Sequence, residues 1–237
     1  MSSLQNFLQH FDRFSFLMAV FSAVAALLCL TVHELSHGAV AYVLGDPTAK
    51  DEGRLTLNPI KHIDPLGLLL MITAHVGWAK PVPVDMRYFK HPKRDMALTA
   101  LAGPASNFLL AWAFLLLANL LGHLLVLFSP SIGLSPWGLL PMLFLINAAV
   151  LSIGLGVFNL FPIPPLDGSK ILFSFLPDKI YYTILRYERY IMILMLALVW
   201  VGVLDKPLSF LMVQLLRGLC FLSGMDFENV LILYSLT

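Results

Sequence analysis

Residues 14–44 have the sequence FSFLMAVFSAVAALLCLTVHELSHGAVAYVL, an apolar run long enough to cross a bilayer as one helix. His33 and His37 lie four residues apart within it, so a helix places both imidazoles on one face, about one turn apart. This spacing is typical of two ligands to one zinc ion, and Glu34 between them is placed to act as a base toward water. The run therefore predicts a membrane helix that carries a hydrolytic metal site. We interpret it as a retained segment and not a signal peptide, because it has no basic stretch before it and cleavage after it would remove the motif.

The composition of the chain excludes an ordinary soluble domain. Hydrophobic residues make up 59% of the sequence and charged residues only 12%, whereas soluble domains carry about 25% charged residues. The formal net charge of +1 gives no general attraction for nucleic acid, which is not an expected partner. Because the chain is so hydrophobic, the lipid bilayer is the expected partner. Cys29 and Cys220 both lie in apolar stretches, so we expect them to pack in the interior and not to form a disulfide framework or a cysteine zinc site.

Hydropathy predicts an all-α polytopic membrane protein with about five transmembrane helices. The runs near 14–44, 97–128 and 139–161 are long enough to span a membrane without help. The stretches 190–204 and 207–223 are shorter, and we expect them to form a C-terminal helical pair.

Two further features complete the expected architecture. Residues 66–78 are apolar but short, which favours a re-entrant or sixth membrane segment. Residues 77–84 carry alternating prolines and predict a small extended or β element. The chain has no internal repeat or long linker, so 1–237 is expected to be one domain with a catalytic core at about 14–175 and a helical extension at about 180–237.

The distribution of positive charge predicts the orientation in the membrane. Basic residues favour cytoplasmic loops, and they gather in two clusters, one at Lys80, Arg87, Lys90, Lys93 and Arg94 and one at Lys170, Lys179, Arg186 and Arg189. The connection 129–138 has no charged residue and is expected outside. The metal motif is then expected near the cytoplasmic side, with the N-terminus outside.

A catalytic zinc takes three protein ligands and leaves one position open, so the two histidines require a partner from elsewhere in the chain. Asp167 is the candidate. It follows the segment NLFPIPPL, whose prolines cannot continue a helix and would leave carbonyl groups without partners in lipid, so this segment must line a protein cavity. Gly168 then permits a tight turn. The alternative is that Asp167 only caps a helix.

The remaining histidines lack a second ligand type at useful spacing. They are His10, His62, His75, His91 and His123, and we expect them to be interfacial or hydrogen-bonded. His75 is the exception of interest, because it lies at the end of the possible re-entrant segment.

Three asparagines are candidates for contact with a substrate. Asn107 follows Gly103 and Pro104 in an apolar run, and we expect it to donate to the carbonyl oxygen that becomes negative during hydrolysis. Asn147 and Asn159 lie near the same membrane depth, where they could orient a substrate or bond between helices.

A transmembrane substrate must unwind before its peptide bonds can be cut. Pro81 and Pro83 remove donors from one edge of the extended segment and leave the other edge able to pair. We expect Pro81, Val82 and Pro83 to border the site and receive the unwound substrate by strand addition. A proline-stiffened loop explains the sequence equally well.

The chain resembles the site-2 protease family of intramembrane zinc metallopeptidases, in particular its short prokaryotic members without a PDZ domain. The matching motifs occur in order and are HELSH at 33–37, LNP at 57–59, IDPLG at 63–67, GWAKPVPV at 77–84, AGPASN at 102–107 and FNLFPIPPLDG at 158–168. By this resemblance His33, His37 and Asp167 correspond to ligands of one Zn²⁺ per chain, and Glu34 corresponds to the base. Asn107 lies in a motif thought to face the substrate. The resemblance implies cleavage of transmembrane protein substrates in a prokaryotic cell membrane.

Three functions remain to be compared. The leading one is an active zinc endopeptidase. A zinc-holding scaffold that binds transmembrane helices would need the ligands but not Glu34, and a metal transporter would use intramembrane histidine and aspartate as a pathway. The base between two helical ligands favours the enzyme. The sequence makes no prediction of oligomeric state.

Overall fold

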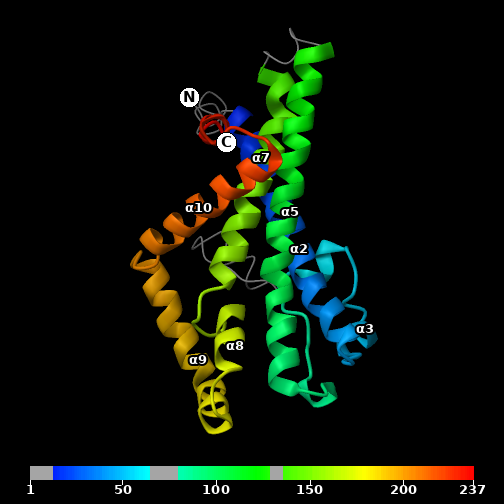
Figure 1. Cartoon of the computed structure of the whole chain (residues 1–237), viewed down its shortest axis with the longest axis vertical. Helices are drawn as coiled ribbons and strands as arrows, with labels where there is room; N and C mark the ends of the chain where they lie inside the picture. The colour runs from blue at the N-terminus through cyan, green and yellow to red at the C-terminus, as the bar shows by residue number, and fades with distance from the viewer. Residues whose placement is uncertain (1–12, 65–79, 129–135) are drawn as a thin grey trace, which may run out of the picture.

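Three long apolar helices lie side by side in the computed structural model, which describes residues 13–64, 80–128 and 136–237 (Figure 1). They are α2 (Arg13–Val43), α5 (Pro92–Phe128) and α7 (Pro136–Asn159). At about 1.5 Å per residue, each is longer than the hydrocarbon core of about 30 Å. All three are long and apolar enough to cross a membrane. The three strong spans predicted from hydropathy are therefore found as helices, each a candidate membrane span.

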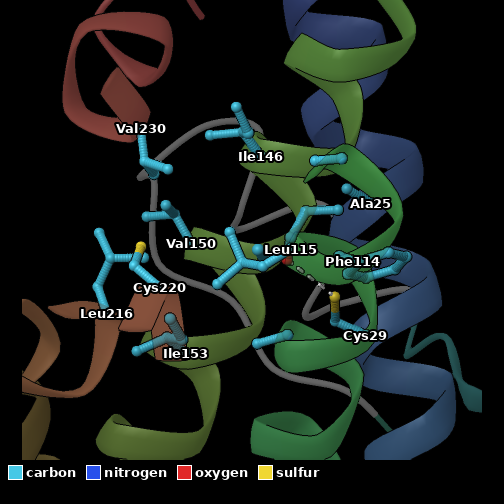
Figure 2. Packing of buried hydrophobic residues seen from close by; sticks show 14 of the residues in the cluster. Ala25, Cys29, Phe114, Leu115, Ile146, Val150, Ile153, Leu216, Cys220 and Val230 are labelled. Atoms are coloured by element: carbon cyan, nitrogen blue, oxygen red, sulfur yellow. Dashed lines mark hydrogen bonds between the residues drawn. The ribbon is translucent and has the colours of Figure 1, made fainter. Parts of the chain in front are cut away.

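Helix α7 is the central helix of this bundle. In its most apolar stretch 56% of the residues are buried, against 22% in α2 and α5. Figure 2 shows the reason: Ile146, Val150 and Ile153 of α7 lie between Leu115 of α5 on one side and Leu216 of the C-terminal region on the other. The outward faces of α2 and α5 remain apolar and exposed, as expected for surfaces in contact with lipid.

The C-terminal region consists of four helices. They are α8 (Asp167–Phe173), α9 (Asp178–Trp200), α10 (Asp205–Ser223) and α11 (Phe227–Tyr234). The last two pack on α7 and bring Leu216, Cys220 and Val230 into the core. Figure 1 shows α10 leaving α7 obliquely and α9 turning down toward α8.

Helices α9 and α10 form the predicted helical pair, but the two are bent by 80° at the break between them. Gly202 lies in this break with φ of +77°, a conformation that residues with a Cβ rarely adopt. The pair counts as at most one further span, so the described residues contain three or four candidate spans. The predicted total of about five is not confirmed.

Short elements fill the connection between α2 and α5. They are α3 (Thr48–Asp51) and the 3₁₀ turns η1 (Pro59–His62) and η2 (Met86–Tyr88). Residues 80–84 have no regular secondary structure, and no strand occurs in the described ranges. The β element expected at 77–84 is thus not found as a strand at 80–84, where backbone groups bond to the side chains of Arg54 and Glu34. The Lys80 N–H group bonds to the His62 carbonyl beside Ile63, which forms an isolated β-bridge. Residues 77–79, the segment 66–78 and His75 lie outside the described residues.

Candidate active site

The two histidines of the HELSH motif lie side by side on α2. Both are buried, and their rings meet edge to face with centroids 4.5 Å apart. Their Nε2 atoms are 3.0 Å apart. The four-residue spacing on a helix thus brings two ligand atoms to one point.

Asp167 meets both histidines from α8. Its Oδ2 atom lies 3.1 Å from Nε2 of His33 and 3.1 Å from Nε2 of His37. The carboxylate is the first residue of α8, directly after the extended residue Leu166. Gly168 makes this turn possible, because a Cβ there would lie 2.0 Å from the Leu160 carbonyl oxygen.

The three ligand atoms have the spacing that a metal ion requires. Tetrahedral zinc with bonds of about 2.0 to 2.1 Å holds its ligand atoms about 3.3 Å apart, close to the 3.0 and 3.1 Å found here. Within the described ranges, no other three His, Cys, Asp or Glu side chains come together in this way. Two imidazoles and one carboxylate suit zinc and leave room for a further ligand.

Helix α5 contacts the Nδ1 atom of each histidine, on the side of the ring opposite the cluster. The Nδ1–H group of His37 donates to the Thr99 carbonyl oxygen at 2.7 Å, which leaves its Nε2 lone pair facing the cluster. The amide of Asn107 lies 3.2 Å from Nδ1 of His33.

The orientation of the Asn107 amide follows from its surroundings. With the amide nitrogen toward His33, the buried Oδ1 atom has no partner among the described residues. Exchanging the amide oxygen and nitrogen places Oδ1 against Nδ1–H of His33, so the ring donates and its Nε2 is free for a metal. Both histidines then have the tautomer that metal binding needs.

Lys170 completes the surroundings of the carboxylate. Its Nζ lies 3.5 Å from Oδ1 of Asp167, the oxygen that does not face the histidines. Burial of Asp167 opposes its charged form. In the absence of a metal ion, a proton on Nε2 of either histidine bonds to this carboxylate, and these bonds, together with the charge of Lys170, outweigh burial and hold the pKa of Asp167 well below the usual value. A bound metal ion would take the place of that proton. The carboxylate is therefore ionised and available as a ligand.

Glu34 lies beside the cluster and faces a cavity of about 260 Å³. Its Oε2 atom accepts a hydrogen bond of 2.8 Å from the Val82 N–H group. The cavity is bounded by α2, α5, the end of α7, α8 and the segment 80–84. Its lining residues are His33, Glu34, His37, Pro81, Val82, Val84, Met96, Thr99, Ala100, Asn159, Pro165, Asp167 and Lys170. Glu34 and the three candidate metal ligands thus share one small pocket.

Comparison with known proteins identifies the family. A model of peptidase family M50 matches residues 119–202, which contain Asp167. A Bacillus subtilis protein named "Putative zinc metalloprotease YwhC" is 40% identical over 181 residues, which cover 74% of this chain and 78% of the relative. The chain belongs to the site-2 protease family, peptidase family M50. This finding confirms the resemblance drawn from the motifs and makes the chain a member of a family of membrane zinc metalloproteases.

Mycobacterial relatives are longer than the matched region. "Putative zinc metalloprotease Rip2" of Mycolicibacterium smegmatis is 34% identical over 64% of this chain and 56% of its own length. The protein of the same name from Mycobacterium tuberculosis H37Rv is 32% identical over 73% of this chain and 63% of its own length. The chain thus spans somewhat more than half of these relatives. No solved structure matches it.

The remaining candidate residues of this M50 site fall into two groups. Pro81, Val82 and Asn159 line the cavity, although the Asn159 Nδ2 atom donates to the Leu155 carbonyl of its own helix. Pro83 and Asn107 are not among the described residues of the cavity wall, and Asn107 is fully buried. The geometry therefore places Asn107 against Nδ1 of His33, where it can orient the ring.

Asn147 lies away from the M50 site. Its Nδ2 atom donates to the Ser22 hydroxyl at 2.7 Å and joins α7 to α2. Of the two interpretations open for this residue, bonding between helices is the one the contacts support. His62 is likewise structural, because it is fully buried and bonds to the Thr56 carbonyl oxygen.

Sequence reasoning missed three contributors to the site. Lys170 could have been found, because a residue three positions after Asp167 on a helix shares its face. The Thr99 carbonyl carries no side-chain signal. Arg54 is distant in sequence, and it acts by donating to the carbonyl oxygens of Lys80 and Pro81 at 2.8 and 3.3 Å.

Proposed function

We propose that this protein is an intramembrane zinc endopeptidase that hydrolyses peptide bonds in or near transmembrane segments of other membrane proteins. The observation that carries the proposal is the meeting of His33, His37 and Asp167 around one point, with Glu34 in the same pocket. When bound, zinc supplies Lewis-acid chemistry that makes water a nucleophile near neutral pH.

Glu34 acts as the general base. Its carboxylate takes a proton from the attacking water and passes it to the leaving amine. The Val82 N–H group occupies Oε2, so Oε1 is the oxygen left free for proton transfer. A scaffold that only held zinc would need the three ligands but no base.

The segment 80–84 receives the substrate. Within the described residues, the Val82 carbonyl and the Val84 N–H group have no hydrogen-bond partner, so they are the backbone groups available to an unwound peptide. Pairing there holds the peptide extended along the wall that also positions Glu34. Asn159 and Lys170 lie on the wall contributed by the end of α7 and by α8.

The proposed setting is a prokaryotic cell membrane with the site toward the cytoplasm. The relatives are bacterial, and both predicted basic clusters adjoin the site, since Lys80 precedes Pro81 and Lys170 lines the pocket. Reporter fusions at residue 90 should give a cytoplasmic signal; a periplasmic signal would reverse this orientation.

Cleavage of a transmembrane peptide by purified protein tests the proposed activity. Glu34→Gln should bind as much zinc as wild type but cleave at least about a hundredfold more slowly, since a general base contributes about 10²–10⁴-fold. Glu52→Gln, on the exposed turn after α3, is the matched control and should cleave normally. Equal cleavage by Glu34→Gln and wild type would remove Glu34 from the mechanism, and no cleavage by zinc-loaded wild type would favour the scaffold.

A further inference from the structure

A second and larger cavity lies on another face of the helices that hold the active site. It has a volume of about 660 Å³, within the range of about 300–1,000 Å³ found for ligand sites. The cavity opens between the beginning of α5 and the end of α8. Its lining residues are His91, Pro92, Lys93, Arg94, Ala97, Leu98, Leu101, Ile171, Ser174, Phe175 and Asp178.

Among the described residues, one cation that lines this groove has no hydrogen-bond or ion-pair partner. Lys93 donates to the Leu176 carbonyl oxygen and pairs with Asp178, with both Nζ distances at 2.5 Å. Arg94 is exposed and makes no hydrogen bond or ion pair with the described residues. Among the residues that line the groove, the charges of Lys93 and Asp178 cancel. The guanidinium of Arg94 therefore gives the lining a net positive charge.

The groove lies where α5 changes from charged to apolar. Lys93, Arg94 and Asp95 occupy its first turn, and Leu98 and Leu101 follow as exposed residues. At 1.5 Å per residue, Arg94 and Leu98 are about 6 Å apart along the helix. This change marks the level at which a membrane span passes from the headgroups into the hydrocarbon.

We propose that this groove binds an anionic phospholipid. The phosphate pairs with the guanidinium of Arg94, which can present two N–H groups to phosphate oxygens. One acyl chain follows Leu98 and Leu101 of α5 and packs against Ile171 and Phe175 in and after α8. A soluble phosphate compound has no apolar group to pack against these side chains, whereas a phospholipid has both a phosphate for Arg94 and an acyl chain for the apolar wall.

The proposed lipid contacts both helices that support the active site. Thr99, which holds His37, lies between Leu98 and Leu101, and Asp167 begins the helix that carries Ile171. A lipid that contacts α5 and α8 together favours their packed arrangement. Binding should therefore raise the temperature at which the protein unfolds.

Titration of the purified full chain with phosphatidylglycerol, followed by thermal unfolding and by native mass spectrometry, tests the inference. Wild type should gain stability and retain phosphatidylglycerol in preference to phosphatidylcholine. Arg94→Gln should bind phosphatidylglycerol about fivefold more weakly, the effect of one basic residue at a membrane surface. Arg186→Gln, which removes an exposed arginine outside the groove, should bind as wild type does.

Three outcomes would overturn the proposal. The first is equal binding of phosphatidylglycerol and phosphatidylcholine by wild type. The second is an equal loss of affinity for phosphatidylglycerol in Arg94→Gln and Arg186→Gln. The third is stabilisation of wild type by free glycerol phosphate as large as that by phosphatidylglycerol. The last would assign the site to a soluble anion. The wild-type comparison of the two lipids needs no variant, so a folding defect in Arg94→Gln would not prevent a decision.

Discussion

At the scale of single residues, the buried side chain of Asn107 fixes the ring orientation and the tautomer of a candidate metal ligand, His33. Its amide oxygen is the only described acceptor within reach of the His33 Nδ1–H group once the amide is oriented as the geometry requires. The Asn107 carbonyl in turn accepts from the Ser152 hydroxyl at 2.8 Å, which ties α5 to α7. The sequence predicted that Asn107 donates to the carbonyl oxygen of a substrate, and its contact with His33 depends on the folded position of α2, which no local pattern indicates.

Substitution of Asn107 separates these two roles. Asn107→Ala should weaken zinc binding about 10- to 100-fold, because His33 loses the acceptor that fixes its ring. Asn107→Asp keeps an acceptor oxygen and should retain zinc. Asn147→Ala, which removes an amide bonded to Ser22 away from the site, serves as the control. If Asn107→Ala held zinc as tightly as wild type while losing activity, Asn107 would act on the substrate and not on His33.

Gly103 matters because the imidazoles of the ligands pack directly against it. A Cβ at this position would lie 2.5 Å from His37 and 2.6 Å from His33. Gly103→Ala should therefore displace both rings and lower zinc affinity about tenfold or more. The measurement is zinc retained per chain during dialysis against a chelator.

Gly218→Ala provides the matched control for this substitution. Both glycines lie inside helices, so both variants gain helix propensity of about 1 kcal/mol. A Cβ at Gly218 meets nothing within 4 Å. Equal zinc retention in the two variants would show that the approach of α5 to the histidines is not as close as described.

At the scale of elements, the segment 80–85 is fixed over the site by side chains that are distant in sequence. Arg54 donates to two of its carbonyl groups, and Asp46 accepts from the Asp85 N–H group at 2.7 Å. Arg54 and Asp46 are both buried. Between these two anchors, the Val82 N–H group reaches Glu34.

Loss of the Arg54 anchor should reduce catalysis without removing the metal. Arg54→Gln shifts the segment that orients Glu34, and a misplacement of about 1 Å can cost about 100-fold in rate. Zinc content should stay normal, because the three ligands do not contact this segment in the described contacts. Lys90→Gln removes an exposed cation from the same connection without touching the segment 80–85, and should cleave normally. Combined loss of zinc and activity in Arg54→Gln would contradict this division of roles.

Hydropathy and motif spacing predicted the helices that carry the site, but not the contacts between them. Apolar runs define α2, α5 and α7, and the proline segment before Asp167 indicated that this residue lines a cavity. The carbonyl of Thr99 and the anchors of the segment 80–85 depend on the folded positions of distant segments, which no local pattern encodes. The small extended or β element expected at 77–84 shows the same limit over its described part, 80–84, since alternating prolines fit both an extended strand and a proline-stiffened loop.

At the scale of the whole molecule, the core and the site occupy successive parts of the same helices. On α5, Thr99 and Asn107 face the histidines, whereas Phe114 and Leu115 pack in the core. Figure 2 shows that α10 and α11 close the far side of this core. The C-terminal region is therefore part of the packing that holds α7 in place.

This arrangement predicts that α10 contributes to stability. Leu216→Ala removes a side chain that is 5% exposed and should destabilise the protein by about 2–5 kcal/mol. Phe221→Ala, on the same helix but 85% exposed, should have a much smaller effect. Thermal unfolding in detergent measures both, and equal effects would mean that α10 does not pack as described.

The proposed activity requires one metal ion held by α2 and α8 together. The decisive measurement is zinc per chain after dialysis against a chelator, for wild type, Asp167→Ala and the control Asp178→Ala, which alters an aspartate that likewise begins its helix. We expect one zinc per chain in wild type and in Asp178→Ala, and little in Asp167→Ala. Retention of zinc by Asp167→Ala as tight as in wild type would contradict the assignment of Asp167 as a ligand.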